Sequence, residues 1–304
     1  MFYCNMAIDS HVHTKYSKHA VGEIEDVILV AISRGVRIIT ITDHAPFPID
    51  CKNRILLTEL NDYLDEIYKL KYLYRDDITI LTGLECDFIP REKYVCFVKY
   101  LLDSVDIDYA IGSIHYVFLD NEKYNIWDIE KINNINFIEE YFVYLRELVN
   151  SNLFDSIGHP DSILRCGMTE KLFLEYLKPL ISIIHKNNIA WEINTSGSFK
   201  KSICDSNGII NTYPSLKALD ELSKNKVNFT IGSDAHNPKD VFRGYSSIMS
   251  KLDEKTIDNI VYFKKRKAYN KLLGGGVFDN WRILLFARYG RWSFCKWTIT
   301  QKHK

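Results

Sequence analysis

The 304-residue sequence lacks the patterns that mark several large classes of protein. Its seven cysteines are scattered without a CxxC pair, so neither a disulfide framework nor a cysteine zinc site is indicated. No apolar stretch approaches the ~20 residues that span a bilayer, and no basic and apolar leader opens the chain. Lys and Arg number 39, as do Asp and Glu, so no net charge favours nucleic acid or a membrane surface. We therefore expect a cytoplasmic globular protein without a transmembrane segment or a nucleic-acid partner.

The chain does contain seven short apolar runs typical of β-strands: MAID, RIITIT, ITILTGLE, YAIGSIH, DSIGH, IAWEIN and NFTIGSD. Most lack strict alternation, as parallel strands buried on both faces do. Segments with helical spacing lie between them, and Pro179 inside one segment predicts a kinked or shortened helix. Strands that alternate with helices predict a parallel sheet with right-handed crossovers. Because seven is one short of the usual eight, the prediction is an α/β fold, a distorted seven-stranded (β/α)7 TIM-like barrel.

The composition changes only near the end, where Gly274–Gly276 is followed by a basic and aromatic segment with three tryptophans. We therefore divide the chain into a barrel over residues 1–273 and an extension over residues 274–304. The extension either packs on the outside of the barrel, or forms an interfacial or oligomer-forming segment, or is disordered.

Histidines and carboxylates recur where the predicted strands end. Imidazole and carboxylate are natural ligands for zinc, manganese and iron. In α/β barrels the chemistry lies at the carboxyl ends of the strands, so ligands from many strands can meet there. The pattern predicts a multinuclear metal site at one mouth of the barrel. The candidate ligands are His11, His13, His44, Glu85, His115, His159, Asp234 and His236.

Spacing within these clusters refines the assignment. His11 and His13 are two residues apart and share a face of an extended strand, so both can reach one ion. Asp43 and His44 face opposite ways, and we assign His44 as the ligand and Asp43 as a supporting group. The two oxygens of Glu85 can serve separate ions, so this residue can bridge them. Asp9 either orients a ligand histidine or forms a turn.

Three further residues are candidates for substrate chemistry. In GHPD, Asp161 is expected to project into the mouth, where it either donates a proton to the leaving group or caps the next segment. Arg165 in the same loop either clamps a phosphate bidentately or lies on the surface. Glu192 ends the sixth strand and either contacts the substrate or supports the ligands.

In motif content and order the chain resembles the PHP (polymerase and histidinol phosphatase) superfamily, closest to its histidinol-phosphatase branch. The motifs are DSHVHT, TDHAP, GLECDF, GSIH, GHPD, EINTSG and GSDAH, over roughly three quarters of the chain. The resemblance implies a distorted seven-stranded barrel with two or three divalent ions, zinc, manganese or iron. It places the first ion on His11, His13, Glu85 and Asp234, and the second on Glu85, His115 and His159. The third rests on His19, His44 and His236, which adds the loop histidine His19 to the ligand set.

The resemblance also implies the reaction, hydrolysis of a small phosphate monoester, with L-histidinol phosphate as the favoured substrate. Arg165 is the first candidate for the phosphate and Arg243 the second, and Glu192 would meet the organic part of the substrate. A phosphotyrosine-protein phosphatase, or another phosphoesterase of the same fold, is the enzymatic alternative. The non-enzymatic alternative is a metal-bound scaffold that binds a partner through the C-terminal extension.

Overall fold

The computed structural model describes residues 7–270 except 50–51, 130–134, 200–202, 206–207 and 211–212. Seven strands form one sheet with the order β1-β2-β3-β4-β7-β8-β11, and all neighbours run parallel. Each predicted apolar run supplies one strand, so the predicted seven-stranded parallel barrel is confirmed. The strands are β1 (Ile8–Val12), β2 (Ile38–Ile41), β3 (Thr79–Asp87), β4 (Tyr109–Ser113), β7 (Ser156–Ile157), β8 (Ala190–Asn194) and β11 (Phe229–Gly232).

The two edge strands of the sheet approach each other and bring the barrel close to closure. The backbone N–H of Asp234 donates to the carbonyl of His11 at 2.8 Å, and that of His13 donates to the carbonyl of Ala235 at 2.8 Å. Every residue of β1 and β8 is buried, which explains why these runs do not alternate. At some positions neighbouring strands lie so close together that only glycine fits between them. A side chain at Gly158 would collide with Ser113 and Ile111 on the neighbouring strand.

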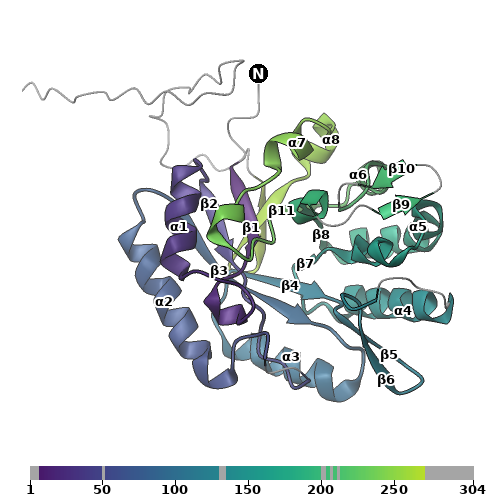
Figure 1. Ribbon diagram of the computed structural model, residues 1–304, viewed down its shortest axis with the longest axis horizontal. Helices are drawn as coiled ribbons and strands as arrows, with labels where there is room; N and C mark the ends of the chain where they lie inside the picture. Colours follow the sequence, from purple (N-terminus) through teal and green to yellow (C-terminus); the bar gives the residue numbers. More distant parts are fainter. Residues whose placement is uncertain are drawn as a thin grey trace, which may run out of the picture.

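Helices follow the strands and cover the outside of the barrel (Figure 1). Their apolar stripes face the sheet, as amphipathic helices require. α5 continues through Pro179, so the expectation of a shortened helix is wrong; burial of Phe173, Leu177 and Leu180 on the same helix holds it against its neighbours. The helices are α1 (Ile24–Ser33), α2 (Leu60–Leu73), α3 (Glu92–Ser104), α4 (Ile135–Ser151), α5 (Glu170–Lys186), α6 (Leu216–Lys224), α7 (Tyr245–Met249) and α8 (Glu254–Asp258).

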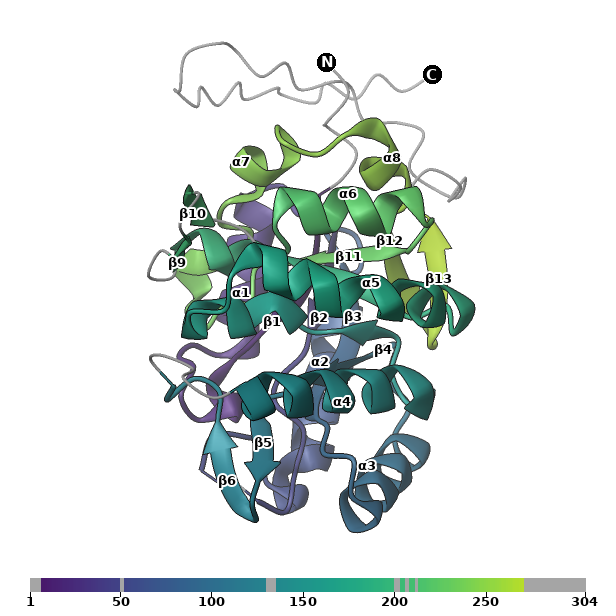
Figure 2. The same cartoon turned by 90° about the vertical axis from the view of Figure 1, so that its right-hand side faces the viewer.

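Two antiparallel hairpins lie toward the carboxyl ends of the strands and one lies at the opposite end (Figure 2). The first pair joins β5 (Tyr116–Leu119) to β6 (Glu122–Asn125), and the second joins β9 (Ile203–Asp205) to β10 (Gly208–Ile210). At the amino end, β12 (Val261–Lys264) pairs with β13 (Lys267–Asn270). Phe263 of that hairpin stacks on Tyr109 with ring centroids 5.3 Å apart, so it seals the base of the barrel.

The predicted basic and aromatic extension, residues 274–304, lies outside the described residues. Within the part of the chain that the structure describes, no helix is long and apolar enough to cross a membrane.

Candidate metal centre

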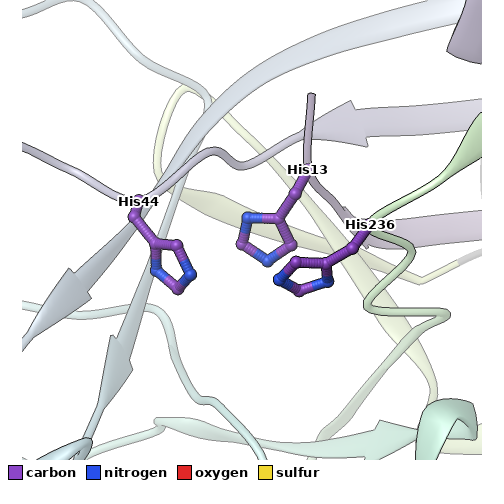
Figure 3. Close-up of side chains that lie close together, drawn as sticks. All are labelled: His13, His44 and His236. Atoms are coloured by element: carbon purple, nitrogen blue, oxygen red, sulfur yellow. The ribbon is translucent and has the colours of Figure 1, made fainter. Parts of the chain in front are cut away.

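The predicted ligand side chains converge at one mouth of the barrel, although they come from five strand ends and two loops. β1 carries His11 and His13 toward this mouth, and the loop after β11 carries Asp234 and His236. Figure 3 shows the imidazoles of His13, His44 and His236 turned toward one another from three separate segments. The predicted convergence of distant residues on one point is therefore observed.

Glu85 lies at the centre of the cluster, and its two oxygens face different histidines. Its Oε2 lies 3.3 Å from the Nε2 atoms of both His11 and His13. Its Oε1 lies 3.0 Å from His159 Nε2 and 3.5 Å from His115 Nε2. One carboxylate thus separates two groups of imidazoles, the geometry that a bridging ligand between two cations needs.

The first group of ligand atoms is completed by Asp234. Its Oδ1 lies 3.4 Å from His13 Nε2 and 3.8 Å from His11 Nε2, and the two Nε2 atoms are 2.9 Å apart. Asp234 has a left-handed backbone with φ of 51°. A non-glycine residue adopts this conformation at a cost, so surrounding contacts must hold the carboxylate in place.

A third group, His19, His44 and His236, lies nearer to solvent and contains the loop histidine. His19 Nε2 and His236 Nε2 are 2.9 Å apart. The ring centroid of His44 lies 5.2 Å from that of His19 and 6.2 Å from that of His236. His13, His44 and His236 also bring one ring nitrogen each within 4.8 Å of one another. The three residues that the resemblance assigned to a third ion are therefore neighbours in space.

Hydrogen bonds at the opposite ring nitrogens orient most of these imidazoles. His11 Nδ1 donates to Glu192 Oε1 at 2.5 Å, and His115 Nδ1 donates to Asp87 Oδ1 at 2.7 Å. His19 Nδ1 donates to the carbonyl of Ser17 at 2.8 Å. Because these bonds occupy Nδ1, each Nε2 is left to face the centre, which is the arrangement of metal-ligating histidines.

The charge balance of the cluster fits divalent cations. Burial would raise the pKa of Glu85, but the positive charge of nearby imidazoles, that of His11 above all, holds the pKa well below its usual range. Burial lowers the pKa of His44 to about 4, so its imidazole is neutral at physiological pH. Glu85 Oε2 is buried and has no hydrogen-bond donor within the described residues. Burial alone would lower the pKa of His11, but the neighbouring carboxylates Glu192 and Glu85 raise it well above its usual range. Imidazole nitrogens and carboxylate oxygens are the donor set that zinc, manganese or iron binds.

Two aspartates near the ligands have structural roles. Asp43 accepts hydrogen bonds from the backbone N–H and hydroxyl of Thr14 and from the hydroxyl of Ser17, so it holds the loop after β1 in place. Asp9 accepts from the backbone N–H groups of Ser233 and Phe242. Asp9 therefore joins β1 to the segment after β11, and Glu192 takes the role of orienting His11.

The ligand cluster forms one wall of a cavity of about 630 Å³, a volume within the usual range for small-molecule sites. Arg54 in this cavity is buried and pairs with Asp87 Oδ2 at 2.6 Å. No motif or strand end in the sequence singles out Arg54, because it lies in an irregular segment. The lining residues other than the candidate ligands are Asn53, Arg54, Tyr116, Asn125, Trp127 and Arg165.

Of the predicted substrate-binding residues, the structure places Arg165 in the cavity. Its Nη2 donates to the carbonyl of Trp127 at 2.8 Å and to that of Ile126 at 3.2 Å. Its guanidinium carbon lies 4.8 Å from the centre of the Trp127 ring. Its Nε has no hydrogen-bond partner within the described residues. The guanidinium is therefore held in a fixed position at the wall of the cavity.

The other two predicted substrate contacts are placed elsewhere. Glu192 is 1% exposed, and its second oxygen accepts from the backbone N–H of His159 at 2.7 Å. Both Glu192 oxygens are thus engaged with the ligand cluster, so the expected contact with the organic part of the substrate is wrong. Arg243 pairs with Asp240 at 3.1 Å, its guanidinium carbon lies 3.7 Å from the centre of the Phe199 ring, and it is not among the residues that line the cavity.

Asp161 does not project into the mouth, contrary to the expectation from GHPD. His159 adopts a left-handed backbone with φ of 30°, and the 3-10 helix η4 (Pro160–Cys166) that follows carries Asp161 into the core. The Asp161 side chain is fully buried, and neither oxygen has a hydrogen-bond partner within the described residues. Burial raises the pKa of Asp161 well above its usual range.

The fold and the site together define a TIM-like barrel with a candidate multi-histidine metal centre. A family model described as "PHP domain" matches residues 9–196, which is more than half of the chain. The chain therefore belongs to the PHP domain family, as the motif order indicated.

Curated relatives and solved structures agree with this assignment. A Deinococcus radiodurans protein named "probable histidinol-phosphatase" is 29% identical over 77% of this chain and 87% of the relative. The histidinol-phosphatase of Bacillus subtilis is 26% identical over 80% of this chain and 98% of the relative. The crystal structure of a histidinol phosphate phosphatase from Lactococcus lactis, complexed with zinc, L-histidinol and phosphate, superposes with a TM-score of 0.72. It is 20% identical and covers 86% of this chain and 98% of that chain.

Proposed function

We propose that this chain is a metal-dependent phosphoesterase that hydrolyses L-histidinol phosphate to L-histidinol and phosphate. The observation that carries the proposal is the position of Glu85, whose two oxygens face separate groups of imidazoles at the cavity wall. Membership of the PHP domain family and the names of the curated relatives support the substrate.

The metal centre is proposed to hold two or three divalent ions, zinc, manganese or iron. His11, His13, Asp234 and Glu85 would hold one ion, and Glu85 with His115 and His159 would hold a second. His19, His44 and His236 would hold the third. The zinc named with the Lactococcus lactis structure supports zinc as one of the metals. Bound cations would supply an activated water at neutral pH and neutralise charge on the phosphoryl oxygens.

The residues of this chain would bind and orient the substrate around that chemistry. Arg165 would clamp the phosphate, because its guanidinium lines the cavity and two carbonyls hold it in place. Glu192 and Asp87 would keep His11 and His115 in the tautomer that presents Nε2. Water would add to phosphorus as the ester P–O bond breaks in line, and a proton from that water would end on the leaving alkoxide, which gives L-histidinol.

Metal analysis of the purified protein and phosphate release from a small panel test the proposal. The panel contains L-histidinol phosphate, phosphotyrosine and a dinucleotide. We expect divalent metal in the protein and the highest kcat/KM on L-histidinol phosphate. A higher kcat/KM on phosphotyrosine would favour a protein phosphatase. Metal without release from any monoester would favour a scaffold that is not an enzyme.

Arg165→Gln provides a second test with a matched control. Loss of the guanidinium should raise KM for every phosphate monoester about ten-fold to a hundred-fold, since a charge-assisted pair contributes about 1.5–3 kcal/mol. Arg146→Gln makes the same change on the exposed face of α4 and should leave KM unchanged. Equal KM values for the two variants would remove Arg165 from the phosphate site.

A further inference from the structure

Trp127 stands on the cavity wall beside the ligands of the proposed second ion. Its ring centroid lies 5.5 Å from that of His159, at an interplanar angle of 75°, and 6.3 Å from that of His115. Among the thirteen lining residues, Trp127 and Tyr116 are the aromatic ones besides the histidines. An organic group joined to a phosphate at Arg165 would lie near this ring, because the guanidinium carbon of Arg165 is 4.8 Å from the centre of the Trp127 ring.

The segment that carries Trp127 is fixed from both sides. The backbone N–H of Ile126 donates to the carbonyl of His115 at 2.9 Å, and Arg165 donates to the carbonyls of Ile126 and Trp127. The backbone N–H of Trp127 donates to Asn125 Oδ1 at 3.0 Å. These bonds fix the backbone of Trp127, and its ring packs against Arg165 and His159. The ring therefore offers a preformed surface, so little conformational entropy of the protein is lost when a ligand packs on it.

We propose that Trp127 is the residue that selects an aromatic, imidazole-bearing alcohol as the leaving group. An indole ring favours a flat ring or a cation against it, by stacking or by cation–π attraction. Since Glu192 is engaged with His11 and His159, no carboxylate on this wall, within the described residues, competes for the imidazole. The proposal rests on the proposed phosphatase function and adds to it the residue that recognises the organic part of the substrate.

The test compares two substrates that differ only in the ring. L-histidinol phosphate carries the imidazole, and L-alaninol phosphate keeps the amino alcohol phosphate with hydrogen in its place. For Trp127→Leu we expect kcat/KM on L-histidinol phosphate to fall about ten-fold, an effect of the size measured for aromatic and cation–π contacts. On L-alaninol phosphate it should stay within about two-fold of the wild type. Trp127→Phe retains a ring and should keep at least about a third of the wild-type preference.

Two outcomes would overturn the proposal. An equal fall on both substrates would mean that Trp127 acts through Arg165, whose guanidinium it covers. If Trp127→Leu keeps both activities and the wild-type ratio of kcat/KM on the two substrates, Trp127 does not contribute to recognition of the imidazole ring. Absence of phosphate release from either substrate by the wild type would instead contradict the proposed function itself.

A control variant separates the Trp127 side chain from the hairpin before it. Tyr124 lies on β6, packs against Phe137 of α4 with ring centroids 5.9 Å apart, and does not line the cavity. Tyr124→Leu should leave the substrate ratio at the wild-type value. A ratio that shifts as much in Tyr124→Leu as in Trp127→Leu would assign the effect to the hairpin and contradict a specific role for Trp127.

Discussion

Glu85→Gln should remove nearly all phosphatase activity while leaving the barrel folded. The change keeps the size of the side chain and the acceptor for the Ser113 hydroxyl, which donates to Oε1 at 2.6 Å. It removes the negative charge that lies within 3.5 Å of five imidazole rings. A neutral amide would also turn its NH₂ toward one set of ring nitrogens or the other, where a cation is proposed to bind.

The size of the effect follows from the contacts of Glu85. Loss of a group that only orients a metal ligand costs about 10–100-fold in metal affinity or activity. Glu85 is proposed to touch two cations directly, so it should cost at least that factor at each of the two sites. The two factors multiply to about 100–10,000-fold, so we expect kcat/KM to fall by at least about a hundred-fold. Metal content per chain should fall with it.

Glu192→Gln makes the same chemical change at a residue that contacts a proposed metal ligand, His11, and not the proposed ions themselves. Glu192 accepts from His11 Nδ1 and from the His159 backbone, so its loss should cost only about 10–100-fold. The assay measures phosphate release from L-histidinol phosphate together with elemental analysis of each purified variant. Equal losses in Glu85→Gln and Glu192→Gln, or a Glu85→Gln protein that keeps its metal and its activity, would refute the bridging role.

Three further predictions concern the surroundings of the site and the base of the barrel. Asp87→Asn should lower activity about 10–100-fold by weakening the bond that orients His115, and full activity would contradict that role. The folded pKa of buried Asp161 lies above 3.8, so the stability tied to its proton is complete below pH 3.8 and is lost as pH rises toward the folded value. Urea unfolding of Asp161→Asn should therefore show a gain over wild type that grows as the pH rises above about 4, and a constant difference would refute it. Phe263→Ala should lower the free energy of unfolding by about 3–5 kcal/mol without changing kcat, because the β12–β13 hairpin lies at the opposite end from the site.

The architecture was predictable from local pattern alone. Seven apolar runs, each ended by a turn-rich cluster, correspond to the seven strands of the sheet. A period of two along β1 placed His11 and His13 on one face, and their Nε2 atoms indeed lie 2.9 Å apart. Parallel strands bring their carboxyl ends to one mouth, so the candidate ligands could be grouped without knowing any distance.

The surroundings of the ligands were less predictable, because they depend on contacts across the barrel. The strand pattern put Glu192 at the mouth, but the partner it meets there, His11, is 181 positions away in the sequence. Asp161 turns inward because His159 adopts a left-handed backbone, which nothing in GHPD signals. Arg54 and Trp127 lie in irregular segments, where neither periodicity nor a motif points to the cavity.

X-ray diffraction data collected at the absorption edges of zinc, manganese and iron would test the central claim most directly. We expect anomalous peaks on both sides of the Glu85 carboxylate, each about 2.0–2.2 Å from a carboxylate oxygen and from histidine Nε2 atoms. Crystals of active enzyme with no anomalous peak within the histidine cluster, or with a metal bound only elsewhere on the chain, would contradict the claim.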